Sequence, residues 1–249
     1  MNRLTKCLKF ELKKSTMGML YYGAIFIGIS ALITLFIGTG VSSDSGDHYA
    51  SSMSFFMPFS IFLFISVMLT YSYHYNYLLM LGNSRKNIML SQIMSYTIIS
   101  IGTAIVVRLL EFGMELLYTN LHYQYTNILN FVYKTNLSLF STILWYFALF
   151  SFICFFSLFL GTLRYKFGRM FSRIFWVAFA LSWIVVPFII SKLNSHINFD
   201  LLLKHLFGIG YKNGIYLATG NFLIIAALFG IIAYFIGIKQ EQIVPEKQQ

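Results

Sequence analysis

Six stretches of this chain are apolar for long enough to cross a lipid bilayer as helices. A bilayer core of roughly 30 Å takes about 20 apolar residues in a helix. The chain has 58% hydrophobic and only 10% charged residues, whereas soluble domains carry about 25% charged residues. The sequence therefore predicts an all-α, polytopic membrane protein. The expected spans are residues 17–41, 53–81, 93–118, 137–163, 174–190 and 221–238.

The Lys and Arg residues between these stretches predict the orientation of the chain. Thirteen lie in the N-terminal segment, the turn after the second span, the connection after the fourth span and the tail, against four in the other connections. Basic residues stay on the cytoplasmic side, so both termini are expected there. The first apolar run is too long for a cleaved signal peptide and is interpreted as the first span. The basic residues do not form a patch typical of nucleic-acid binding, and no nucleic-acid partner is expected.

Residues 1–16 predict an amphipathic helix that lies in the lipid headgroup layer. Two readings of this helix remain open: a basic anchor beside the first span, or a helix that also touches a cytoplasmic partner. Its two expected faces are apolar Leu4, Cys7, Leu8 and Leu12, and basic Lys6, Lys9 and Lys13.

A short polar interruption follows the second span, in the stretch YLLMLGNSRKNIMLSQI. Gly82 ends the helix, and Asn83 or Ser84 is expected to cap a new short helix over residues 83–92. Such a helix suits a groove on a neighbouring protein, but an ordinary basic turn has the same charges. His74, in the tyrosine-rich end of the second span, is interpreted as a side chain of the membrane interface.

The Gly-x-Ser-Arg-Lys motif after the second of six spans resembles the permeases of the ABC-2 type exporter family. The resemblance implies that residues 83–92 are a coupling helix on a separate ATPase subunit, present in two copies and carrying ATP and Mg²⁺. It also implies a second permease copy, identical or paralogous, and the plasma membrane of a bacterium. The implied coupling residues are Gly82, Asn83, Ser84, Arg85, Lys86, Ile88 and Met89.

The same resemblance implies the transport of amphipathic or hydrophobic peptides, such as toxins or antimicrobial peptides, out of the cell. Three other activities remain open on the sequence. These alternatives are a drug or lipid exporter permease, an immunity protein against a peptide antibiotic, and a channel or carrier that needs no ATPase.

Three ionisable residues share one face of the third expected span: Arg108, Glu111 and Glu115. Charged groups within a membrane normally face the bundle interior or water and find partners. We expect Arg108 to pair with Glu111, one turn further along the helix. The stripe is either a polar lining of a transport path or a structural ion pair.

The remaining segments complete the expected organisation. Residues 17–238 are the permease domain, and residues 239–249 are a cytoplasmic tail. Residues 192–220 are too polar to span the membrane and too apolar for a free loop, and the family resemblance implies short re-entrant or outer-leaflet helices there.

Motifs for chemistry by this chain are missing from the sequence. It has no phosphate-binding loop, no nucleophile turn and no metal-ligand spacing. Neither catalytic residues nor a metal site are therefore predicted, and the family resemblance implies that ATP is hydrolysed by the partner. Cys7 and Cys154 lie in a basic segment and in an apolar span, so they are expected to remain free thiols.

Overall fold

The protein is described here from a computed structural model, which describes residues 4–14, 16–18, 21, 49–50, 56–120, 124–125, 128–133, 137–193, 204–211 and 213–240. Four long helices dominate: α2 (Phe56–Met80), α3 (Arg85–Asn120), α5 (Leu139–Leu193) and α7 (Gly214–Ile238). Residues 4–14 form a further helix, which we call the N-terminal helix. The short elements are α4 (Ile128–Tyr133) and two parallel strands, β1 (Tyr49–Ala50) and β2 (Gln124–Tyr125).

The all-helical prediction is confirmed in its coarse form. Four helices of the described part are long and apolar enough to cross a membrane. They match the second, third, fourth and sixth expected spans. The first expected span, residues 17–41, lies almost entirely outside the described residues, and the fifth falls in the second half of α5. The membrane-length segments are Phe56–Met80, Arg85–Gly113, Leu139–Gly168 and Gly214–Ile238.

Two helix boundaries differ from those expected. α3 begins at Arg85 and runs without interruption, so there is no separate short helix over residues 83–92. The reason is that neither Gly nor Pro occurs between Arg85 and Ile93, and nothing stops the helix once it has begun. Likewise, α7 begins at Gly214 instead of Asn221, so part of the 192–220 segment belongs to the last helix.

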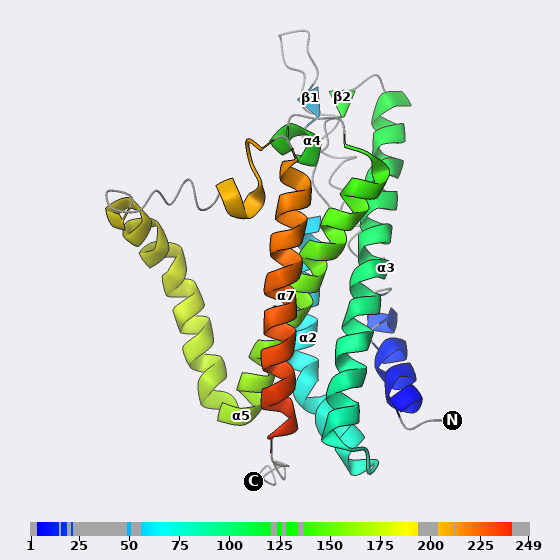
Figure 1. Cartoon of the computed structure of the whole chain (residues 1–249), viewed down its shortest axis with the longest axis vertical. Helices are drawn as coiled ribbons and strands as arrows, with labels where there is room; N and C mark the ends of the chain where they lie inside the picture. The colour runs from blue at the N-terminus through cyan, green and yellow to red at the C-terminus, as the bar shows by residue number, and fades with distance from the viewer. Residues whose placement is uncertain are drawn as a thin grey trace.

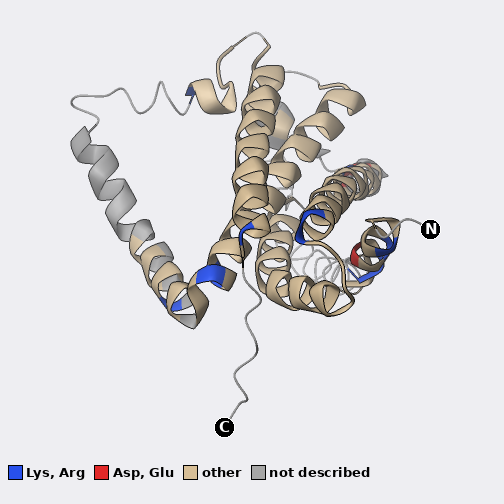
Figure 2. Ribbon diagram, turned by 60° about the horizontal axis from the view of Figure 1, so that its bottom comes forward, with Lys and Arg blue, Asp and Glu red and all other residues tan. Residues whose placement is uncertain are grey.

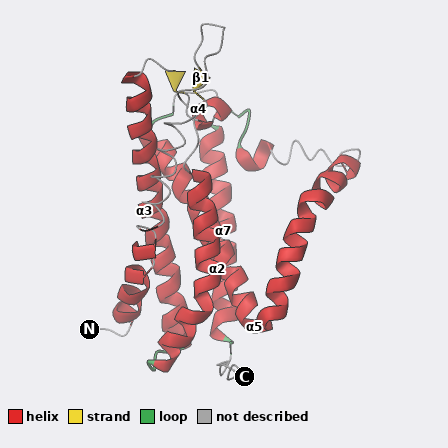
Figure 3. Ribbon diagram, turned by 180° about the vertical axis from the view of Figure 1, so that it is seen from behind, coloured by secondary structure: helices red, strands yellow, loops and turns green. Residues whose placement is uncertain are grey.

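α5 is one helical run with a sharp bend at Gly168. This glycine has φ 71° and ψ −159°, a backbone conformation that residues with a Cβ rarely adopt. The part before the bend, up to Gly168, packs in the bundle beside α2, α3 and α7. The part after it stands away from the bundle in the views from both sides (Figures 1 and 3).

The connections that were expected in the cytoplasm gather at one end of the molecule (Figure 1). The N-terminal helix, the α2–α3 turn, the bend at Gly168 and the last turn of α7 all lie there. Figure 2 shows Lys and Arg on each of these elements. We call this the basic end. β1, β2, α4 and residues 204–207 lie at the opposite end.

Apolar side chains lie both on the outer surface of the helices and between them, and small or hydroxylated residues join the large ones in the interior. One face of α2 exposes an apolar or aromatic residue at nearly every turn: Met57, Ile61, Ile65, Leu69, Tyr73 and Tyr77. The interior face of α3 instead carries Ser91, Ser95, Ser100 and Thr103, whose hydroxyls donate to carbonyls of their own helix. Small and hydroxylated residues let membrane helices pack closely.

Glycines allow the closest approaches between helices. A Cβ at Gly161 of α5 would come within 2.9 Å of the Tyr71 Cβ on α2, and one at Gly230 of α7 within 3.6 Å of the Phe155 ring. α7 presents small buried residues along its length: Gly214, Ala218, Ala226, Gly230, Ala233 and Gly237. These small residues let α7 lie close to its neighbours, and aromatic contacts such as Phe156–Phe229, with ring centroids 5.0 Å apart, add to its packing on α5.

Candidate functional site

The turn between α2 and α3 is short and fully hydrogen-bonded. Gly82 has φ 74°, and its N–H donates to Leu79 O at 2.9 Å, while the Asn83 N–H donates to Leu78 O at 3.3 Å. This pair of bonds is the Schellman motif, in which a left-handed glycine ends a helix. The Asn83 side chain also donates to Leu78 O, at 3.0 Å.

Ser84 begins the next helix in the same turn. Its Oγ accepts from the Asn87 N–H at 3.3 Å, and its carbonyl accepts from the Ile88 N–H at 3.1 Å. The prediction that Gly82 stops α2 and that Ser84 caps a following helix is therefore confirmed. The cap serves the whole of α3, not a separate short helix.

The surface offered by this turn differs from the one expected. Ile88 and Met89 were expected to contact a partner, yet both are fully buried and point into the bundle. Met89 packs against Gly237 of α7, and the Tyr71 hydroxyl donates to its Sδ at 3.5 Å. The exposed residues are Leu81, Gly82, Ser84, Lys86 and Leu90, with Asn83, Arg85 and Asn87 partly exposed.

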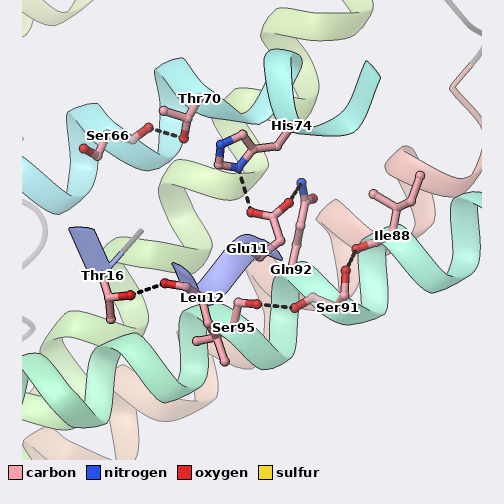
Figure 4. Close-up of polar contacts among 10 residues, drawn as sticks. All are labelled: Glu11, Leu12, Thr16, Ser66, Thr70, His74, Ile88, Ser91, Gln92 and Ser95. Atoms are coloured by element: carbon pink, nitrogen blue, oxygen red, sulfur yellow. Dashed lines mark hydrogen bonds and ion pairs between the residues drawn. The ribbon is translucent and has the colours of Figure 1, made fainter. Parts of the chain in front are cut away.

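The N-terminal helix is fixed beside the turn by a buried acid (Figure 4). Glu11 is fully buried, and its Oε2 lies 2.6 Å from His74 Nδ1 on α2. Its Oε1 accepts from Gln92 Nε2 on α3 at 3.4 Å. A proton must lie between His74 and Glu11 at this distance. We call Glu11, His74 and Gln92 the anchor cluster, because they join three helices.

Aromatic contacts surround the anchor cluster. The Phe10 ring stacks on Tyr77 with centroids 4.8 Å apart and meets His74 edge-on at 5.6 Å. Lys14 Nζ lies 4.3 Å from the centroid of the Tyr73 ring, within cation–π range. Burial and the nearby Glu11 raise the pKa of the Cys7 thiol, which lies one turn before Glu11.

The anchor cluster corrects the interpretation of His74 as an interface side chain, because His74 is 3% exposed. The sequence reasoning also missed Glu11, although one signal was present. Glu11 is the only acid among the first sixteen residues, and it lies four residues after Cys7 on the apolar face. An acid on the buried face of an amphipathic helix requires a partner.

The predicted stripe on α3 is brought together as expected. Arg108 lies 3.7 Å from Glu111 and 4.0 Å from Glu115, which confirms the predicted Arg108–Glu111 pair. Glu111 is 1% exposed and accepts a hydrogen bond from the Tyr146 hydroxyl on α5. The Glu115 side chain is 47% exposed. The stripe therefore joins α3 to α5 through Glu111, and Tyr146 is the partner that sequence reasoning missed.

Neither a disulfide nor a cluster of metal ligands is found in the described part of the chain. Cys7 and Cys154 are free and buried. Within the described ranges, no three His, Cys, Asp or Glu side chains converge as metal ligands. Several of the described polar groups bind across helix interfaces, among them Glu11 with His74 and Tyr146 with Glu111.

No protein-family model, curated protein or solved structure matches this chain. The resemblance to ABC-2 type permeases rests on the residues of the α2–α3 turn and on the expected topology. The function that it implies is accordingly argued below as a proposal.

Proposed function

We propose that this chain is the membrane subunit of an ATP-binding cassette exporter, with ATP and Mg²⁺ bound by a separate ATPase subunit. The observation that carries the proposal is the exposed, basic α2–α3 turn. It joins two membrane-length helices and lies at the basic end of the bundle, with Lys86 and part of Arg85 on its surface.

The geometry of the turn supports a coupling role with a revised contact surface. Since Ile88 and Met89 face inward, the partner is proposed to contact Gly82, Ser84, Lys86 and Leu90 instead. The apolar contact is Leu90, which is 42% exposed. An exposed leucine beside two basic residues suits a groove with an acidic rim.

The buried residues beneath the turn suggest how movement there reaches the bundle. Met89 contacts α7 at Gly237, and Gln92 contacts Glu11 of the N-terminal helix. A displacement of the turn therefore acts on α7 and on the N-terminal helix together. Interfaces of this kind convert small shifts into rearrangements of packed helices.

Two copies of this chain, or one copy and a paralogue, are proposed to form the pathway in the plasma membrane of a bacterium, with both termini in the cytoplasm. The cargo is proposed to be amphipathic or hydrophobic peptides. Aromatic residues make up 19% of the chain, and they offer a broad apolar surface to such peptides.

Co-purification from the native host membrane tests the proposal. The tagged full-length chain should bring down an ATP-binding cassette subunit with measurable ATP hydrolysis. The double variant Arg85→Glu/Lys86→Glu should lose both, because it reverses the charge of the turn. The matched control is Lys6→Glu/Lys9→Glu, which reverses two exposed charges on the N-terminal helix at the same end.

Retention of the ATPase by the control and its loss from the turn variant support the proposal. Equal retention by both variants contradicts it, as does equal loss. Solute conduction by the purified chain in vesicles without any nucleotide would assign the chain to the channels or carriers.

A further inference from the structure

A cavity of about 750 Å³ lies at the basic end, between the bend of α5 and the last turns of α7. It belongs neither to the α2–α3 turn nor to the anchor cluster. Its lining includes Tyr165, Lys166, Ile232, Phe235, Lys239 and Gln240. The cavity therefore combines two ammonium groups with an apolar wall.

The floor of the cavity is fixed by hydrogen bonds. Gln240 is 4% exposed; it accepts from the Tyr71 hydroxyl at 2.8 Å and donates to Thr162 O at 2.7 Å. Tyr165 is also buried, and its hydroxyl donates to Asn76 Oδ1 at 2.6 Å. These bonds tie the end of α7 to α2 and α5, so they fix the backbone beside Lys166 and Lys239, whose side chains are exposed.

The two lysines are exposed and share the cavity without an acidic neighbour in its lining. The ion pairs seen in the described part of the chain are His74–Glu11, Arg108–Glu111 and Arg108–Glu115. Lys166 and Lys239 have no carboxylate within ion-pair distance there. Two ammonium groups with no counter-charge among the described residues attract an anion.

The wall of the cavity determines what kind of anion fits. Ile232 and Phe235 are 44% and 57% exposed and lie on the membrane-length segment of α7. They continue the apolar surface of that helix up to the two lysines. A phosphate ion would leave this wall uncovered, whereas a phospholipid places its acyl chain along the wall and its phosphate between the lysines.

We infer that this cavity binds the headgroup of an anionic phospholipid, with Lys166 and Lys239 as its phosphate ligands and Ile232 and Phe235 as the acyl-chain contact. Basic pockets between membrane helices bind anionic headgroups in this way. The lipid would lie where the second half of α5 leaves the bundle. This inference needs only the membrane character of the chain, and it stands whether or not the exporter proposal does.

Lipid retention measured by native mass spectrometry tests the inference. The purified full-length chain is taken from nanodiscs that hold equal amounts of phosphatidylglycerol and phosphatidylcholine. The wild-type chain should retain phosphatidylglycerol in preference. Lys166→Gln/Lys239→Gln should weaken that binding about 30-fold, since each lysine near a membrane surface contributes a several-fold increase in affinity. Lys166→Arg/Lys239→Arg, which keeps both charges, should retain the preference.

Three comparisons decide the outcome. The matched control Arg85→Gln/Lys86→Gln removes two charges of the α2–α3 turn, elsewhere at the basic end, and it should bind phosphatidylglycerol as the wild type does; equal loss in both Gln variants overturns the inference. Displacement of the lipid by inorganic phosphate at millimolar concentration shows a free-anion site instead. A third test leaves both lysines in place. The tryptophan fluorescence of the Phe235→Trp variant should be quenched more by brominated phosphatidylglycerol than by brominated phosphatidylcholine. Equal quenching by the two lipids overturns the inference.

Discussion

Met89 of α3 packs directly on Gly237 of α7, at a point where a Cβ on residue 237 would overlap the Met89 thioether. Met89 is fully buried and lies four residues into α3. The contact therefore fixes the start of α3, just after the basic turn, against the end of α7. It connects the proposed coupling surface with the last membrane helix.

Gly237→Ala should destabilise the protein by about 1 kcal/mol, because the buried Met89 thioether must shift to make room for the added Cβ. A matched control is Gly220→Ala on the same helix, where an added Cβ meets nothing within 4 Å; it should be neutral or stabilising, because alanine favours a helix over glycine. Thermal unfolding of the purified chain in detergent measures both. In the double variant Gly237→Ala/Met89→Ala the loss should be smaller than the sum of the two single losses, because the alanine at 237 fills part of the space that Met89 leaves. Equal unfolding temperatures for the two alanine variants would contradict the described packing.

Substitutions of His74 and Glu11 in the anchor cluster should change the stability of the protein by different amounts. His74→Ala leaves the carboxyl group of Glu11 buried with one contact fewer, so we expect a loss of roughly 3–5 kcal/mol of stability. Glu11→Gln keeps hydrogen-bonding capacity and removes the charge, so its effect should be about 1 kcal/mol. His205→Ala, at an exposed position of the opposite end, is the control. Limited proteolysis should also show the N-terminal helix released in the His74 variant. A larger effect for Glu11→Gln than for His74→Ala would show that the buried acid is not held by this histidine.

The ionisable stripe on α3 tests a role in transport. In Glu111→Gln the side chain still accepts from Tyr146 but no longer neutralises Arg108, so the chain should fold and its export of peptide should change. Glu115→Gln alters the more exposed partner, 4.0 Å from Arg108, and should have a smaller effect. Export of a fluorescent amphipathic peptide from cells is the measurement. Unchanged export in Glu111→Gln, with normal assembly, would leave the stripe a structural ion pair.

Thiol labelling tests which side of the membrane carries the basic end. Ser84→Cys in the turn should react with a membrane-impermeant maleimide only after the cells are permeabilised, and Lys204→Cys at the opposite end should react in intact cells.

Background labelling should be low, because Cys7 and Cys154 are buried. A thiol reacts as its thiolate, and burial with Glu11 nearby raises the pKa of Cys7 above its usual value. At about pH 7.5 Cys7 is therefore protonated, and its labelling should increase only as the pH approaches that raised pKa. Labelling of residue 84 in intact cells would reverse the proposed orientation.

Much of the helical architecture followed from local sequence, because hydropathy, a helix-ending glycine and a capping serine act within a few residues. The expected second span, residues 53–81, is close to α2 as found, and the Ser84 cap is present. The Arg108–Glu111 pair was also predictable, since both residues lie on one helix face.

Contacts between distant segments were not predictable in this way. Glu11 and His74 are 63 residues apart, and no local pattern in the sequence specifies that their side chains meet in the interior. The same holds for Met89, whose position on an amphipathic turn suggested a contact with a partner until its packing on Gly237 was known. Hydropathy in a membrane helix does not distinguish a side that faces lipid or a partner from a side that faces a neighbouring helix, because both are apolar.

The closed hydrogen bonding of the α2–α3 turn limits the motions available there. Its backbone N–H groups at Gly82 and Asn83 are bound to the end of α2, and Ser84 caps the start of α3. A force on Lys86 would therefore be carried into α3 as a whole, instead of fraying its first turn.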